Sequence, residues 1–344
     1  MFGLYFHFPF CLQKCHYCAF YSKAERHIDF SGWSSFYQKK LDEWENKLGH
    51  SIQPTTIYFG GGTPSLLPPS VIAGILRRFD LKNVEVTIEA NPEAIDEDKM
   101  SAFRDAGVNR LSLGVQSLND DALRFMGRIH TADRAVQMLF TARKIFDRVS
   151  IDLIYGRPGQ TLSAWEDELR RALSFGLKHM SLYQLTVEND WRVVLPDDDT
   201  LADFYELTNA IMKESGLPRY EVSNYAASVD EESRHNLTYW LGGDFLGIGP
   251  KAHSRIGLRE IANNEKGDVE IDKELSTVQR DTEIFLTSIR TRYGVAQRYG
   301  YLTSSDKVNA MVKNGFIAIN DDGHIVATDR GYPVLDSVSA FLLG

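Results

Sequence analysis

The length, composition and charge of this chain exclude several classes of protein. It has 344 residues, of which 43% are hydrophobic and 25% charged, and its formal net charge is −9. This length predicts one large domain with a small one beside it, and the acidic balance disfavours a general binder of nucleic acids or anionic membranes. The chain shows neither an apolar run of about 18 residues nor a signal-peptide pattern, so we expect a cytoplasmic protein without stable membrane insertion.

The first predicted element is a strand at residues 4–8, which runs into a short cysteine-rich loop. This loop contains every cysteine of the chain: Cys11, Cys15 and Cys18. In a reducing cytosol such a group is more typical of a metal site or a redox device than of a disulfide. A closed zinc site needs four ligands, and only His7 or His16 is near enough in sequence to supply the fourth. An iron–sulfur cluster on three thiolates would keep one iron open to a ligand.

The next elements alternate between strands and helices. Further strands are predicted at residues 55–59, 84–90, 110–115, 148–155 and 180–187. Helices are predicted between them at residues 70–79, 96–107, 131–146 and 164–176. This alternation indicates a parallel sheet with right-handed crossovers. We therefore predict the α/β class, with a partial (β/α)6 TIM-like barrel.

Glycines and polar residues stand where these strands end. In such barrels the chemistry lies at the C-terminal ends of the strands. The residues at these ends are Gly61, Gly62 and Thr63 of "GGGTP", then Glu89, Gln116, Asp152, Thr186 and Glu188. Each has a structural alternative, since the glycines suit a tight turn, Glu89 suits a helix cap, and the others suit buried hydrogen-bonded positions. Together with the cysteines they predict a ligand site along one rim.

The C-terminal third predicts an extension and a second domain. Residues 1–258 form the predicted barrel and its extension, which carries "HNLTYW" at 235–240. The polar segment 259–272 predicts a linker or an exposed hairpin. Residues 273–344 predict helices around a hairpin, a pattern that resembles a small winged-helix domain. Because it lacks a dense basic stripe, a lid or partner-binding role is favoured over DNA binding.

The C-x3-C-x2-C spacing, with Tyr17 before the last cysteine, resembles the signature of the radical S-adenosylmethionine (SAM) superfamily. The resemblance implies a [4Fe–4S] cluster on Cys11, Cys15 and Cys18, with SAM bound at its open iron. It also implies SAM contacts along the rim at Gly61, Gly62, Thr63, Glu89, Gln116, Arg128, Asp152 and Thr186. Tyr5 and Tyr17 either line the cofactor pocket or pack in the core.

A longer series of motifs narrows the resemblance. The stretches "YFHFPFC", "YFGGGTPSLL", "IEANPE", "GVNRLSLGVQS", "GRIH", "DLIYGRPGQT" and "HNLTYW" resemble the oxygen-independent coproporphyrinogen III oxidase family, and more closely its HemW-type heme chaperone branch. Ala19 and Phe20 follow Cys18, where the oxidases carry a further cysteine, and Cys11 comes very early in the chain. The family usually reads C-P-Y-C-D-F at the second and third cysteines, so His16 and Ala19 depart from its pattern.

His235 in "HNLTYW" is the candidate heme ligand. An imidazole is a natural axial ligand for heme iron, and Tyr239 and Trp240 offer rings that stack on a porphyrin. The alternative is a helix start that packs against the barrel. The other candidates are weaker: His7, His16 and His253.

The resemblance implies a HemW-type chaperone that binds a [4Fe–4S] cluster and SAM, carries heme as cargo, and delivers it to client proteins. It also allows a homodimer and implies no nucleic-acid partner. The alternative is an oxygen-independent coproporphyrinogen III oxidase, and a third hypothesis is a radical enzyme that methylates and opens the heme ring. Whether the protein is an enzyme stays open at this point.

Overall fold

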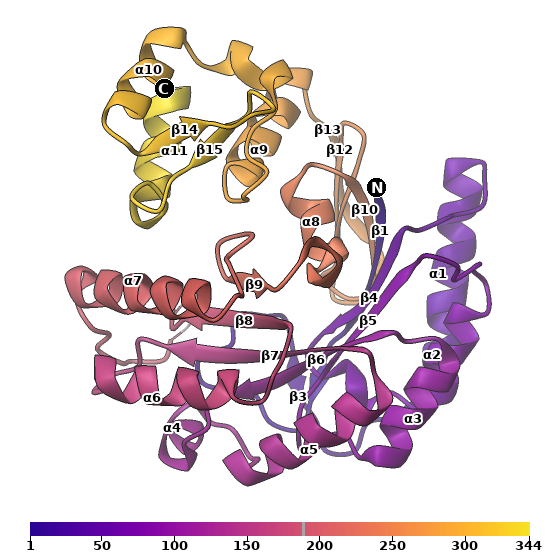
Figure 1. The fold of residues 1–344 in the computed structure, drawn as a ribbon. Coiled ribbons are helices and arrows are strands. Elements are labelled where there is room, and N and C mark those ends of the chain that lie inside the picture. Colours follow the sequence, from indigo (N-terminus) through magenta and orange to yellow (C-terminus); the bar gives the residue numbers. More distant parts are fainter. Residues whose placement is uncertain (188–189) are drawn as a thin grey trace.

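A computed structural model describes residues 1–187 and 190–344, and its largest feature is one mixed β-sheet (Figure 1). In the described residues this sheet has eleven strands, in the order β13-β12-β11-β10-β1-β4-β5-β6-β7-β8-β9. The strands predicted from the sequence are all present and pair in parallel: β1 (Phe2–Phe8), β4 (Thr56–Gly61), β5 (Glu85–Ala90), β6 (Arg110–Gln116), β7 (Arg148–Tyr155) and β8 (His179–Gln184). The predicted α/β sheet is therefore confirmed, while Glu188 lies outside the described residues.

The sheet extends beyond the predicted strands at both edges. Next to β1, the strand β10 (Asp244–Ile248) pairs in parallel. Three antiparallel strands follow it: β11 (His253–Ile256), β12 (Arg259–Asn263) and β13 (Val269–Glu274). At the other edge, β9 (Asn224–Ala226) pairs antiparallel with β8. The segment 259–272, predicted as a linker or an exposed hairpin, thus forms a hairpin of the main sheet.

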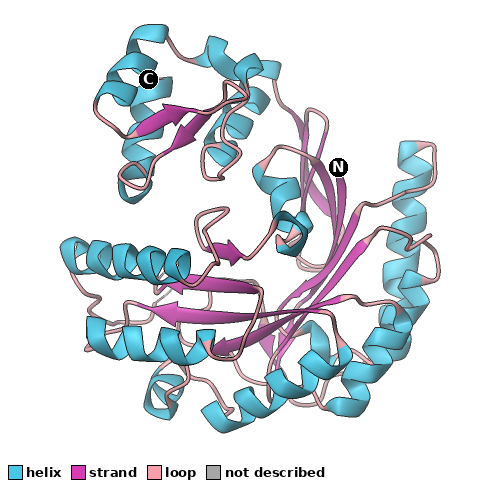
Figure 2. Ribbon diagram, viewed as in Figure 1, coloured by secondary structure: helices cyan, strands magenta, loops and turns pink. Residues whose placement is uncertain are grey.

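Helices cover the outer face of the parallel strands (Figure 2). They are α1 (Trp33–Leu48), α2 (Pro69–Leu76), α3 (Glu97–Ala106), α4 (Asp120–Phe125), α5 (Ala132–Ile145), α6 (Leu162–Leu173) and α7 (Asp198–Glu214). Capping residues determine where these helices begin and end. The Asp96 carboxylate accepts the backbone N–H of Lys99 at the start of α3, and Gly107 ends this helix with φ 112°. The predicted helices at 70–79, 96–107, 131–146 and 164–176 correspond to α2, α3, α5 and α6.

The main core lies between the sheet and these helices. On β6, the outward-facing side chains of Leu111, Leu113 and Val115 are buried in it. Trp165 of α6 and Phe103 of α3 are fully buried on the helix side. Burial of these apolar side chains drives the sheet and the helices together.

The C-terminal part has a core of its own. It contains α9 (Thr277–Ser288), α10 (Ser305–Lys313), β14 (Ile317–Ile319), β15 (Ile325–Ala327) and α11 (Leu335–Leu343). Buried apolar residues hold it together, among them Phe285, Ile289, Val295, Ile317 and Leu342. This order of helices around a hairpin agrees with the predicted winged-helix-like domain. The short helix α8 (Arg234–Trp240) lies between this part and the sheet (Figure 1).

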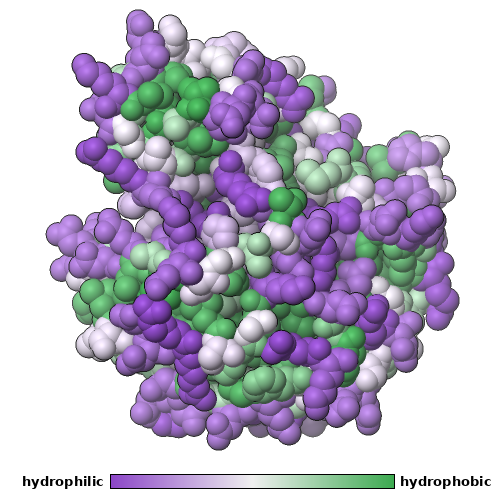
Figure 3. Space-filling view, in the orientation of Figure 1, coloured by the Kyte–Doolittle hydropathy of each residue, from purple (hydrophilic) through white to green (hydrophobic). Residues whose placement is uncertain are grey.

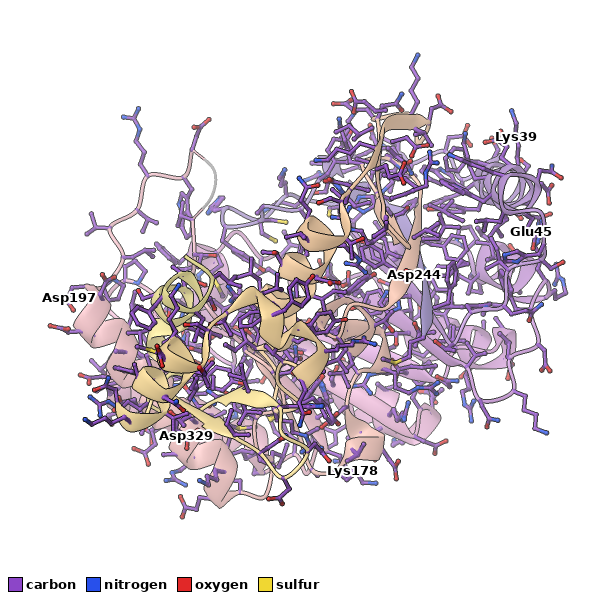
Figure 4. The ribbon with its side chains drawn as sticks, turned by 90° about the horizontal axis from the view of Figure 1, so that it is seen from above. Lys39, Glu45, Lys178, Asp197, Asp244 and Asp329 are labelled. Atoms are coloured by element: carbon purple, nitrogen blue, oxygen red, sulfur yellow. The ribbon has the colours of Figure 1, made fainter. Side chains whose placement is uncertain are left out.

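The C-terminal part also contacts the main body. The Arg219 guanidinium lies 3.4 Å from the Tyr332 ring centroid and 3.3 Å from a carboxylate oxygen of Asp329, which Figure 4 labels. Figure 3 shows hydrophilic side chains over most of one face, with hydrophobic ones gathered in the C-terminal part and over the central sheet. Among the described residues, no helix combines the length and the apolar character needed to cross a membrane. The part of the chain that the structure describes also contains four short 3-10 helices: η1 (Pro64–Leu66), η2 (Val229–Glu231), η3 (Gln297–Leu302) and η4 (Tyr332–Val334).

Candidate functional site

A cavity of about 430 Å³ lies within the curve of the parallel strands. Most of the residues that the sequence proposed for the site line it: Cys11, Cys15, Tyr17, Cys18, Gly61, Gly62, Thr63, Glu89, Gln116, Arg128, Asp152 and Thr186. Two proposed residues, Tyr5 and His235, do not. The strand ends thus meet as expected for parallel strands of one sheet.

Alternation along the strands explains why the cavity is polar. Successive side chains of a strand point to opposite faces. On β6 the cavity is lined by Arg110, Ser112, Gly114 and Gln116, while the residues between them face the helices. The same period places Ser150 and Asp152 of β7, and His179, Ser181 and Tyr183 of β8, on the cavity. The inward-facing positions of β6, β7 and β8 therefore carry mostly polar side chains.

The cysteine loop is fixed to the rim at several points. It leaves β1 through β2 (Phe10–Cys11), which pairs with β3 (Lys23–Ala24). The N–H of His16 donates to the Met126 carbonyl at 3.1 Å, and Arg128 Nη1 lies 3.3 Å from Cys15 Sγ. The three thiols are free of disulfides, and burial raises the pKa of Cys11 and Cys18. Thiolates at these positions therefore need a cation to stabilise them.

The glycine loop packs directly against the cysteine strand. The N–H of Gly62 donates to the Phe8 carbonyl at 2.7 Å, and the N–H of Thr63 donates to the Phe10 carbonyl at 2.8 Å. A Cβ on Gly62 would lie 2.6 Å from the Phe10 oxygen and 3.0 Å from Cys11 Sγ. Glycine is thus required here for close packing within the protein, besides any approach to a ligand.

We expect Gly62→Ala to destabilise the protein and disturb the cysteine loop. The added methyl group meets backbone atoms, which cannot move aside as a flexible side chain does. The expected loss is about 1–3 kcal/mol of unfolding free energy, measured by chemical denaturation. The matched control is Gly300→Ala, because a Cβ there meets nothing within 4 Å. Equal stability of the two variants would contradict this account of the loop.

Two carboxyl groups face the cavity from β5 and β7, the two strands that flank β6. Glu89 accepts hydrogen bonds from the Tyr58 hydroxyl at 2.8 Å and from the Gly61 N–H at 3.3 Å. Burial raises the pKa of Glu89 to about 7, although these bonds favour the charged form. Burial likewise raises the pKa of Asp152 to about 6. The cap of α3 is Asp96, so Glu89 does not serve as the helix cap that the sequence allowed.

The raised pKa of Glu89 predicts a pH-dependent stability. Its pKa in the unfolded chain is 4.5, so the unfolded state loses its proton first as the pH rises. The stabilisation is complete below pH 4.5 and is lost as the pH rises through about 7. Because Glu89 is partly exposed to the cavity, we expect a loss of about 2 kcal/mol between pH 5 and 8, relative to Glu89→Gln. Parallel stability curves of the two proteins in urea would contradict this prediction.

Gln116 and Arg128 complete the rim. Gln116 has a left-handed backbone with φ 64°, which is costly for a residue other than glycine, and a register shift of β6 accompanies it. Arg128 Nη2 donates to Asn91 Oδ1 at 2.7 Å and to the Gly114 carbonyl at 3.0 Å. Arg128 therefore joins the cysteine loop to the ends of β5 and β6.

Comparison with known proteins identifies the family. Residues 5–172 match the model of the radical SAM superfamily. The chain is 36% identical to "Radical S-adenosyl methionine domain-containing protein 1, mitochondrial" of Danio rerio, over 84% of this chain and 67% of that protein. It is 31% identical to the heme chaperone HemW of Buchnera aphidicola subsp. Acyrthosiphon pisum (strain APS), over 93% of this chain and 90% of that protein.

This chain belongs to the HemW family of radical SAM proteins. The coproporphyrinogen III oxidase HemN from Escherichia coli, described as a radical SAM enzyme, has a similar structure with a TM-score of 0.80. The two chains are 21% identical, and the match covers 99% of this chain and 89% of that one. At this identity the likeness concerns the fold alone, and it confirms the predicted partial barrel with its C-terminal domain.

Membership of the HemW family implies a [4Fe–4S] cluster and SAM as cofactors, and the residues of the cavity fit them. Three thiols share one wall, which suits a cluster with one open iron. Arg128 Nε is buried and has no hydrogen-bond partner among the described residues, so a polar ligand atom can satisfy it.

Tyr5 and His235 do not line the cavity and lie instead among β1, β4 and α8. The Tyr5 hydroxyl lies 3.1 Å from His7 Nδ1, and its ring stacks on Tyr58. His235 is 1% exposed; its Nδ1 lies 2.8 Å from Thr56 Oγ1, and its Nε2 lies 2.6 Å from the Tyr239 hydroxyl. Burial lowers the pKa of His235 to about 3. Both ring nitrogens are thus engaged, so binding a heme iron would require breaking one of these contacts.

The residues at the inner end of the cavity were not predicted from the sequence. Six polar residues there were not singled out: Arg110, Ser112, Ser150, His179, Ser181 and Asn224. The available signal was the strict polar–apolar alternation of "RLSLGVQ". Strands of a fully buried parallel sheet are usually apolar on both faces, so this alternation indicates an interior cavity.

Proposed function

We propose that this protein is a heme chaperone that holds a [4Fe–4S] cluster on Cys11, Cys15 and Cys18, binds SAM at the rim, and carries heme to client proteins. The observation behind it is the convergence of the three thiols, the glycine loop and the rim side chains on one cavity. The heme function rests on relatives called heme chaperone HemW, of which that of Mycobacterium tuberculosis aligns over 100% of this chain at 34% identity.

The rim residues have distinct roles in this proposal. The cysteine thiolates hold the cluster, and Gly61, Gly62 and Thr63 offer backbone groups to the SAM amino group. Ionised Glu89 accepts a hydrogen bond from that ammonium group, because it already faces the cavity beside the Gly61 N–H. When bound, a [4Fe–4S] cluster supplies an electron to SAM.

The other rim residues orient the cofactor. Arg128 is 9% exposed and carries a positive charge that suits the SAM carboxylate. Gln116, Asp152, Thr186 and Tyr17 offer polar atoms along the rest of the wall. Because Asp152 already accepts from Ser112 Oγ at 3.1 Å, its orientation is fixed before a ligand binds.

A heme titration of the anaerobically reconstituted protein tests the proposal. We expect one heme per chain, followed by absorbance, and transfer of that heme to an apo-cytochrome. Dithionite with SAM and coproporphyrinogen III is the parallel assay, and we expect no decarboxylated product. Turnover of coproporphyrinogen III without specific heme binding would instead make the protein an oxidase, and a methylated tetrapyrrole would make it a heme-modifying enzyme.

A further inference from the structure

The inner end of the cavity, remote from the cysteines, is lined by polar side chains. Arg110 is the first residue of β6 and His179 the first of β8, whereas the SAM rim lies at the last residues of these strands. Six residues of parallel strand separate Arg110 from Gln116, which corresponds to about 20 Å. Thr87 of β5 is the register partner of Arg110, and Ser150 of β7 is that of His179. Arg110 lies opposite Arg148 on β7, and Ser150 lies opposite Ser112 on β6, so the two pairs occupy successive inward-facing levels of the sheet. We call these two levels the inner layer.

Four buried polar atoms in this layer lack hydrogen-bond partners among the described residues. They are Thr87 Oγ1, Arg110 Nη2, His179 Nδ1 and Asn224 Oδ1, and all four residues line the cavity. Their residues are 1%, 2%, 4% and 4% exposed, respectively. Buried polar atoms are nearly always paired, because unpaired burial forfeits their bonds to water. Their common position on one cavity wall points to a ligand as the partner.

The hydrogen bonds around His179 determine which ring nitrogen carries the proton. The Ser233 N–H donates to the Tyr220 oxygen at 3.1 Å, and the Tyr220 hydroxyl lies 2.9 Å from His179 Nε2. The arrangement that satisfies every group has the Tyr220 hydroxyl donating to Nε2. Burial and the charges of Arg110 and Arg148 lower the pKa of His179, so its ring is neutral. The remaining proton is then on Nδ1, which is a donor facing the cavity.

The charges of this layer favour an anion. Glu85 Oε2 lies 3.6 Å from Arg110 Nη1 and 3.0 Å from Arg148 Nη1, so one carboxylate is shared between two guanidinium groups. Arg110 Nη1 already donates to the Glu231 carbonyl at 3.0 Å, which leaves Nη2 for a ligand. The acids Glu89 and Asp152 follow Thr87 and Ser150 by two residues on β5 and β7. Glu89 lies level with Ser150 and His179, and its carboxyl group is already engaged by the Tyr58 hydroxyl and the Gly61 N–H.

We propose that the layer of Thr87, Arg110 and His179 is a subsite for a carboxylate group. A carboxylate offers two oxygen atoms to the guanidinium Nη2, the imidazole Nδ1–H and the threonine hydroxyl, which are three donors on one wall. The carboxylate belongs either to a small free acid or to a propionate arm of heme. The second source rests on the proposed heme function, whereas the first does not.

The most informative variant is Thr87→Val, because it removes one ligand donor and breaks no hydrogen bond of the described protein. Arg110→Lys is the second variant, and it keeps the positive charge while removing the planar guanidinium group with its paired N–H donors. Thr303→Val is the matched control, since Thr303 Oγ1 is also buried and unpartnered among the described residues but lies in the C-terminal part, away from the cavity. Thermal unfolding establishes that each variant is folded.

Two probes distinguish the sources of the carboxylate. Sodium propionate is titrated calorimetrically into the reconstituted protein, and heme is compared with heme dimethyl ester by absorbance. We expect Thr87→Val to weaken carboxylate binding about tenfold, and Thr303→Val to leave it unchanged. If the ester binds about tenfold more weakly than heme and Thr87→Val removes this difference, the group is a heme propionate. If propionate alone responds to Thr87→Val, it is a small free acid.

The inference is overturned if neither propionate nor the heme–ester difference responds to Thr87→Val, since the layer then holds only water. Failure of the proposed heme function gives a different result. In that case the wild-type protein binds no heme, and the propionate titration still tests the subsite. Should Arg110→Lys fail to fold, Thr87→Val carries the test, because valine matches threonine in shape.

Discussion

Cys15→Ala abolishes iron–sulfur cluster binding and, with it, tight binding of SAM. The wild-type protein reconstituted under anaerobic conditions is expected to hold about four iron and four sulfide ions per chain, with broad visible absorption. Three thiolates are the minimum set for such a cluster, and all three cysteines of the chain already belong to it. Removal of one thiolate therefore leaves two, and we expect iron, sulfide and SAM affinity to be lost together.

Iron and sulfide analysis together with a SAM titration measures this effect. Ser150→Ala is the control, because Ser150 lines the same cavity on β7, away from the cysteine loop, and loses only its hydroxyl group. We expect this control to keep the full cluster. Retention of four iron ions by Cys15→Ala would contradict the proposed ligand set. A colourless wild-type protein that takes up zinc in preference to iron would support the zinc alternative instead.

His235→Ala is expected to lower the unfolding free energy by about 3 kcal/mol while changing heme affinity less than threefold. The substitution removes the contacts to Thr56 at 2.8 Å and Tyr239 at 2.6 Å, and it leaves two buried hydroxyl groups without that partner. It also removes a ring stacked on Tyr58 at 4.8 Å between centroids. Tyr58 donates to Glu89 at 2.8 Å, and Glu89 is a proposed SAM contact. We therefore expect a lower SAM affinity together with the loss of stability.

Urea denaturation and heme titration of the same preparations separate a structural role from iron ligation. His253→Ala serves as the matched control, because His253 is exposed on β11 and we expect its loss to change stability by less than about 0.5 kcal/mol. His235→Gln retains part of the hydrogen bonding and should recover part of the stability. A heme affinity reduced more than tenfold in His235→Ala, at unchanged stability, would establish His235 as the heme ligand that the sequence suggested.

His16 and Ala19 depart from the family pattern at the surface of the cysteine loop. His16 Nδ1 lies 3.0 Å from the Phe125 carbonyl, and its ring contacts Trp191 at 5.6 Å between centroids. These contacts hold the loop against α4 and the residues around it, whereas a proline at this position would restrict the loop through its own backbone. Ala19 lines the cavity without a polar group, and nothing in the structure explains the absence of an acidic residue there.

The sequence by itself determined the repeating strand–helix order and the composition of the rim. The alternation of hydrophobic and polar residues defines each strand, and parallel pairing brings the C-terminal ends of the strands to one edge of the sheet. Glu89, Gln116 and Asp152 stand near the ends of their strands, so their place at this edge could be predicted from the sequence. The spacing of three cysteines within eight residues likewise requires no tertiary information, because a single loop carries all the proposed ligands.

Only the tertiary structure decided which residues from distant segments of the chain contact one another. The pairing of β10 with β1 joins residues more than two hundred positions apart, and no local pattern specifies such a partner. Thr56 and His235 are 179 positions apart, and the ring nitrogens of His235 are engaged because α8 packs against β1 and β4. The carboxylate subsite arises in the same way. Thr87, Arg110 and His179 stand on three different strands, and they line one cavity only because the register of the sheet places them on successive inward-facing levels.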